Sequence, residues 1–121
     1  MSCTITEERI GHIKKVRFDW ATASSSSGGT TGTTTYPYTG TLERLVTVPG
    51  TSAAAPTASY DVVVNDQDST DALMGAGGNR HASNTEQVGA ASLGVVANDT
   101  LTLSVTNAGS SHSGTVIVYI K

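Results

Sequence analysis

Three carboxylates stand close together in the run Asp66-x-Asp68-x-x-Asp71. Carboxylate oxygens are ligands that Ca²⁺ prefers in proteins, so the run first suggests a cation-binding loop. The EF-hand template does not fit, because it needs glycine at its sixth position and glutamate at its twelfth, where this chain has Asp71 and Gly77. We interpret the run as a solvated turn whose side chains bond their own backbone, with a looser cation loop as the alternative. No metal site is predicted.

The other reactive side chains form no recognisable site in the sequence. His12, His81 and His112 lie far apart and lack the spacing of metal ligands. The glycine-rich stretch 75–78 lacks the Lys-Ser/Thr pair of a phosphate-binding loop and favours a flexible or left-handed turn. Cys3 is the only cysteine, which excludes an internal disulfide. We expect no catalytic residue, no cofactor and no enzyme activity.

Large polar and aromatic side chains are instead candidates for contact with another protein, because arginine and aromatic residues are enriched at interfaces. Tyr36 and Tyr38 flank Pro37 in a pattern typical of an exposed turn. Arg44 interrupts an otherwise apolar face of a predicted strand. Trp20 is interpreted first as a core residue and second as a contact. The predicted interface residues are Arg17, Trp20, Tyr36, Tyr38 and Arg44.

The composition indicates which kind of element positions these residues. Serine and threonine make up 33 of the 121 residues, and valine outnumbers leucine by 12 to 6. Threonine and valine suit a pleated, half-buried surface and suit a helix poorly. Leu, Ile, Val and Phe together number only 24, so we expect a thin core.

Alternation of apolar and polar residues predicts short strands along the whole chain. Val16, Phe18 and Trp20 share one face of a strand over 15–20, and Leu42, Arg44, Val46 and Val48 share one face of a strand over 42–48. Other strands are predicted at 4–6, 58–64, 93–97, 101–106 and 115–120, and the Ser83-x-x-Glu86 pattern predicts one helical turn. Short strands separated by Gly, Ser and Asn turns predict an all-β fold of two packed antiparallel sheets or a barrel. We favour the antiparallel β-sandwich, with long Ser/Thr/Gly-rich loops.

The chain is short enough to form a single domain over residues 1–121. Within it, residues 21–35 contain only Ala, Ser, Gly and Thr. Side chains this small bury little surface, so we predict a low-complexity loop or arm. It packs either on its own domain or against another subunit.

Charge and hydropathy exclude several classes of protein. The net charge is −3, with seven basic residues scattered along the chain, which argues against nucleic-acid binding. No apolar run is long enough to span a membrane. The charged start of the chain also does not resemble a signal peptide.

Four segments in this order resemble the small head-decoration (cement) proteins of tailed bacteriophages: TYPYTGTLERLVTVPG, PTASYDVVVNDQDSTDAL, GNRHASNTEQV and LTLSVTNAGSSHSGTVIVYI. The resemblance covers roughly residues 5–121. It implies a β-sandwich or jelly-roll fold, and a structural protein of the virion.

The resemblance also implies partners and a location. The chain would bind the major capsid protein on the outer surface of the capsid, as a homo-oligomer (dimer or trimer), and stabilise contacts between capsomers. It would be made in the host cytoplasm and end in the virion. The alternative is a tail, baseplate or host-surface-binding module of a phage particle.

Overall fold

The structure is a computed structural model that describes residues 2–23 and 29–121. Within these residues the chain forms nine strands and two single-turn 3₁₀ helices, which confirms the predicted all-β class. The strands are β1 (Ser2–Ile10), β2 (Ile13–Ala21), β3 (Thr30–Thr33), β4 (Tyr38–Pro49), β5 (Asp61–Asn65), β6 (Glu86–Gly89), β7 (Val95–Asp99), β8 (Thr102–Thr106) and β9 (Ser113–Ile120). The 3₁₀ helices are η1 (Ser52–Ala54) and η2 (Ala90–Ser92). No helix in the described part of the chain is long and apolar enough to cross a membrane.

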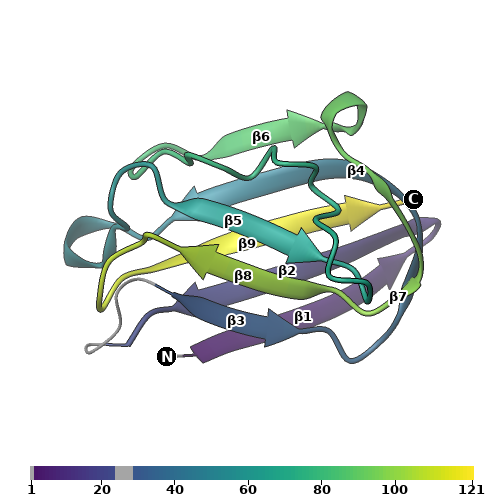
Figure 1. Ribbon diagram of the computed structural model, residues 1–121, viewed down its shortest axis with the longest axis horizontal. Coiled ribbons are helices and arrows are strands. Elements are labelled where there is room, and N and C mark those ends of the chain that lie inside the picture. The colour runs from purple at the N-terminus through teal and green to yellow at the C-terminus, as the bar shows by residue number, and fades with distance from the viewer. Residues whose placement is uncertain (1, 24–28) are drawn as a thin grey trace.

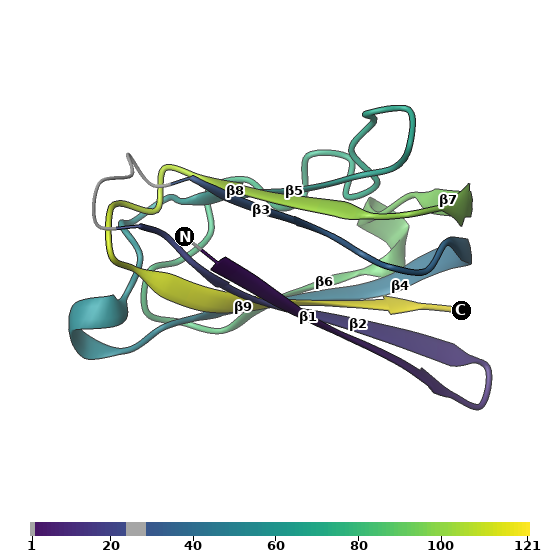
Figure 2. The ribbon, with the colours of Figure 1, turned by 90° about the horizontal axis from the view of Figure 1, so that it is seen from below.

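The strands form two antiparallel sheets, shown face-on in Figure 1 and edge-on in Figure 2. The large sheet has the order β1-β2-β9-β4-β6, and β7 pairs with the first part of β4. The small sheet has the order β3-β8-β5 and lies over the large one. The predicted antiparallel architecture is therefore present, whereas the jelly-roll form stays a prediction.

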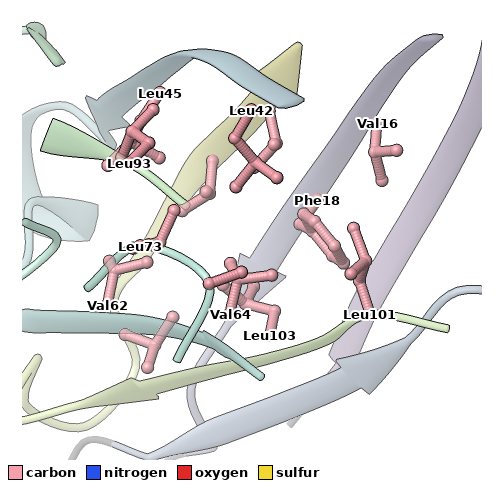
Figure 3. Close-up of a cluster of buried hydrophobic side chains, with 14 of the residues drawn as sticks. Val16, Phe18, Leu42, Leu45, Val62, Val64, Leu73, Leu93, Leu101 and Leu103 are labelled. Carbon is pink, nitrogen blue, oxygen red and sulfur yellow. The ribbon is translucent and has the colours of Figure 1, made fainter. Parts of the chain in front are cut away.

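The hydrophobic core lies between the two sheets (Figure 3). Val16, Phe18 and Trp20 of β2 are all buried, as their alternation predicts. Leu103 and Val105 of β8 face them from the small sheet and are also fully buried. Two-residue periodicity therefore identified the inward face of both strands correctly.

Strand β4 contains a β-bulge that corrects one sequence prediction. The register between β4 and β9 shifts between Leu42 and Arg44, so that Leu42 pairs with Ile120 but Arg44 with Tyr119. A bulge inserts one extra residue and reverses the face on which the following side chains lie. Leu42 and Leu45 are consequently both fully buried, and the prediction that Leu42 and Arg44 share a face is wrong.

Two other sequence predictions are corrected. The stretch 21–35, predicted as a loop or arm, contains strand β3, which pairs with β8; residues 24–28 of that stretch lie outside the described residues. The predicted helical turn at Ser83–Glu86 does not form. Instead β6 begins at Glu86, whose carboxylate accepts a hydrogen bond from the His81 backbone N–H at 2.8 Å. The glutamate of the predicted capping box therefore holds the loop that precedes β6 and does not cap a helix.

Candidate protein-binding face

The outward side of the large sheet carries side chains that differ from those expected of a solvated face. One face of an antiparallel sheet normally packs on the core while the other alternates with polar residues facing water. Here the central strands β4 and β9 place apolar and aromatic residues outward. We call this surface the large-sheet face; it comprises Lys15, Arg17 and Asp19 of β2, Thr115, Ile117 and Tyr119 of β9, and Arg44, Val46 and Val48 of β4.

Ile117 and Val46 occupy the centre of this face. They are cross-strand partners, and Arg17 of β2 and Gln87 of β6 continue the same row on either side. Although they point away from the core, Ile117 is only 9% exposed and Val46 only 6%. We attribute this shielding to the long side chains around them, whose aliphatic stems cover apolar neighbours while their polar ends reach water.

Tyr119 lies one row along from Ile117, between two cations. Its ring centroid is 5.8 Å from Lys15 Nζ and 5.3 Å from Arg44 Cζ. Cations at such distances are attracted to the face of an aromatic ring. The contacts hold both positive charges over the centre of the sheet, beside the apolar pair.

Asp19 supplies the main negative charge of the large-sheet face. It accepts a hydrogen bond from Thr115 Oγ1 at 2.7 Å and pairs with Arg17 Nε at 3.1 Å. Burial raises the pKa of the Asp19 carboxyl, but the bonds from Thr115 and Arg17 outweigh this and hold the pKa below its ordinary value. Asp19 also lines a hollow of about 380 Å³ at the end of the face, together with Thr4, Val48 and Thr115.

The large-sheet face contains two of the five predicted interface residues. Arg17 and Arg44 lie on it, on strands separated only by β9. Both arginines are exposed. The apolar centre of the face, Ile117 and Val46, was missed by the interface prediction. The strand predicted at 115–120 is apolar on both faces, as suits its central place between β2 and β4, but one of those faces points outward.

Trp20 lies in the core, at 1% exposure, with its ring centroid 5.7 Å from that of Tyr60. Gly114 packs against it so closely that a Cβ there would lie 2.6 Å from the Trp20 ring. The indole therefore stabilises the packing of the sheets, which confirms Trp20 as a core residue, while its role as a contact stays a prediction.

Tyr36 and Tyr38 lie at the end of the sandwich, where β3 leads into β4. Tyr36 is 63% exposed, but Tyr38 is 6% exposed and donates its hydroxyl to Glu7 Oε1 at 2.7 Å. Burial and this hydrogen bond raise the pKa of Tyr38 above its ordinary value. The Glu7 carboxylate also accepts the backbone N–H groups of Thr35 and Tyr36, so it fastens this segment to β1. A hollow of about 300 Å³ lies beside it, lined by Glu7, Glu8, Arg9, Lys14 and residues 36–38.

The carboxylates of the 66–71 turn do not gather as their spacing suggests. Asp71 turns to the backbone and accepts N–H groups of Val64, Leu73 and Gly75. Asp99 of β7 takes its place, and oxygens of Asp66, Asp68 and Asp99 lie within 4.8 Å of one another. Asp66 Oδ1 accepts the N–H groups of residues 68 and 70, so the turn bonds its own backbone as predicted.

Comparison with known proteins identifies no relative of this chain: no protein-family model, no curated protein and no solved structure matches it.

Proposed function

We propose that this chain is a structural protein that binds a protein shell, and that it acts as a decoration (cement) protein on the outer surface of a tailed-phage capsid. The partner is the major capsid protein. The observation that carries the proposal is the large-sheet face, with its shielded apolar pair, its aromatic ring and its cations. Four sequence segments resemble phage decoration proteins, and on this resemblance we propose that the shell is a phage capsid.

The residue types of this face suit recognition of another protein. Interfaces are enriched in tyrosine and arginine at their energetic centres, around a patch from which water is excluded. Tyr119 and Arg44 form such a pair in contact, and Ile117 and Val46 lie next to them. Lys15, Arg17 and Arg44 outnumber Asp19 and the neighbouring Glu8 of β1, so the complementary surface is expected to be acidic.

The proposal is tested by adding the purified chain to undecorated capsids assembled from the major capsid protein of the same genome. We expect saturable binding, with a copy number fixed by the symmetry of the lattice. Bound protein should also raise the temperature at which the capsid disassembles, because a ligand that binds only the assembled state stabilises it. Binding to host cells or to tails without binding to capsids would contradict the proposal and favour the alternative phage module.

Charge reversal on two surfaces distinguishes specific binding by the large-sheet face from general attraction. The variant Arg17→Glu/Arg44→Glu should lose capsid affinity by roughly tenfold or more, because each change places like charges together in the contact. The matched control, Thr31→Glu/Ser110→Glu/Lys121→Glu, makes the same change in net charge at exposed positions that lie outside both the large-sheet face and strand β1. It should bind nearly as the unmodified chain does. Equal losses in the two variants would assign the attraction to net charge alone.

A further inference from the structure

Strand β1 is the most open sheet edge in the described part of the chain. It has nine residues, pairs with β2 on one side without any register shift, and has no strand on the other side. The edge strands β3 and β6 have only four residues each. Natural proteins normally protect a long edge with charged side chains, proline, a bulge or a covering segment. Strand β1 has no proline and no bulge, and the carboxylate of Glu7, one of its three charged residues, is engaged by the segment 35–38.

Strand β5 shows how this same molecule protects an edge. The segment 71–80 runs along its free side, and the backbone N–H of Val62 donates to Gly77 O at 2.8 Å. Further along, Ala72 N donates to Val64 O and Arg80 N to Tyr60 O. No described residue makes such a backbone bond to the free side of β1. The difference indicates that the β1 edge is kept open for pairing.

The backbone groups that point outward from β1 follow from its hairpin. Ile10 and Ile13 are joined by a two-residue turn with Gly11 at φ +61°, and such a turn closes with a hydrogen bond between the residues on either side. In an antiparallel pair the N–H and C=O groups of one residue point to the same side of the strand, and this side alternates from each residue to the next. The N–H and C=O groups of Cys3, Ile5, Glu7 and Arg9 therefore point away from β2. The bond from Thr22 N to His112 O, at the other side of the hairpin, agrees with this alternation.

We propose that this edge pairs with the same edge of a second copy of the chain, antiparallel and about a two-fold axis at Thr6. Full overlap of the two nine-residue strands puts Thr6 opposite Thr6 of the second copy. The outward backbone groups then meet as Cys3 with Arg9 and Ile5 with Glu7, and each such pair exchanges two N–H···O=C bonds. The contact is isologous and joins the two large sheets into one continuous sheet.

The side chains of β1 favour this register over its neighbours. Full overlap places Thr4 opposite Glu8, and no two like charges are opposite each other. Moving the axis to Glu7 places a carboxylate directly opposite its own copy, which destabilises a strand pair. Moving it to Ile5 leaves Arg9 and Ile10 without a partner, so fewer backbone bonds form. The side chains of Thr4, Thr6 and Glu8 are exposed, so the pairing needs no rearrangement of the core. The inference does not depend on the proposed capsid function, because it concerns only contacts between copies of this chain.

A cysteine at the axis tests the pairing directly. Thr6 faces its copy in a non-hydrogen-bonded pair, where Cα atoms lie roughly 4.5 Å apart. This distance falls within the range that a disulfide spans. The variant Cys3→Ser/Thr6→Cys should therefore form a cross-linked dimer under mild oxidation, in nearly full yield. The unmodified chain should sediment at twice its 12.4 kDa monomer mass.

Two further variants fix the register and serve as controls. Cys3→Ser/Thr4→Cys and Cys3→Ser/Glu8→Cys should each stay uncross-linked alone, because neither cysteine faces its own copy. An equal mixture of the two should form the mixed disulfide. A folded but monomeric chain that resists cross-linking at position 6 would overturn the proposal. Equal cross-linking of all three variants alone would overturn it too, because it would indicate random collision.

Discussion

The two outward faces of the sandwich are built from different residues. On the small sheet, strands β3, β8 and β5 turn mainly hydroxyl and amide side chains to the outside: Thr31, Thr33, Asp61, Val63, Asn65, Thr102, Ser104 and Thr106. Thr33 and Thr102 satisfy each other across the strands, with their oxygens 2.9 Å apart. On the large sheet, the corresponding positions hold Ile117, Val46 and Tyr119, with Arg17 beside Ile117 and with Lys15 and Arg44 over the ring of Tyr119.

The difference shows how one molecule can carry a polar face and an apolar, cationic face on the two sides of the same core, and the proposed function assigns binding to the second. Both sheets contribute an apolar inner face to the same core, so the inner residues do not distinguish them. Short hydroxyl side chains keep the small sheet compatible with water, and they bury little surface against a partner. The large sheet shields apolar surface with long cationic side chains, which in the proposed capsid contact would move aside.

Truncation of the central residue of each face should give the largest difference between the two faces in the free energy of unfolding. Ile117→Ala removes side-chain atoms that are shielded on the large-sheet face, and we expect it to lower the free energy of unfolding by about 2 kcal/mol. Ser104→Ala, at the centre of the small-sheet face, should change it by less than about 0.5 kcal/mol. Urea denaturation of both variants measures the two values. Equal effects would show that the faces are energetically alike.

Removal of the aromatic ring of the large-sheet face should have a smaller effect. Tyr119→Leu keeps an apolar side chain but loses the attraction to Lys15 and Arg44, so the expected loss of stability is about 1 kcal/mol. Tyr119→Phe keeps the ring and should remain close to the unmodified chain. The same denaturation measurement compares the two variants. If the phenylalanine variant loses as much stability as the leucine variant, the ring–cation contacts are not the cause.

The smallest expected effect concerns pH and Asp19. Because its folded-state pKa lies below the ordinary value, ionised Asp19 stabilises the fold above the unfolded-state pKa of about 3.9, and this contribution is lost as the pH falls through the folded-state value. Asp19→Asn should therefore be less stable than the unmodified chain at pH 7 by about 0.5 kcal/mol, since its side chain is 42% exposed and solvent screens the pair with Arg17. The difference should shrink in thermal melts as the pH is lowered through the folded-state pKa. A difference that does not change with pH would assign the effect to packing.

Much of the fold could be predicted from alternation alone, because the strands that carry the core have one clean apolar face. Val16, Phe18 and Trp20 are the clearest case. Strand β3 could not be predicted, since Thr-Thr-Gly-Thr has no apolar residue and is held by pairing with β8. Strand β1 was predicted only at 4–6, because Glu7, Glu8 and Arg9 break the alternation, although their backbone continues the ladder with β2.

The candidate site was predictable only in part, because the pairing of distant strands decides which side chains lie together on a face. Arg17 and Arg44 could be proposed as contact residues by type, but the bulge between Leu42 and Arg44 decides which side of β4 turns outward. Register between distant strands is a tertiary property, and it alone brings Ile117 beside Val46 and Tyr119 beside Arg44. Local sequence also could not reveal that Glu7 fastens Tyr38, because the two residues belong to separate strands.

Oxidative footprinting with hydroxyl radicals, read by mass spectrometry on free and capsid-bound protein, tests the role of the large-sheet face most directly. Tyr119 reports on that face, while Tyr36 at 63% exposure and Met74 at 70% report on surfaces outside it. We predict that capsid binding protects Tyr119 from oxidation and leaves Tyr36 and Met74 as reactive as before. Protection of Tyr36 or Met74 with Tyr119 unchanged would contradict the account and place the contact elsewhere on the molecule.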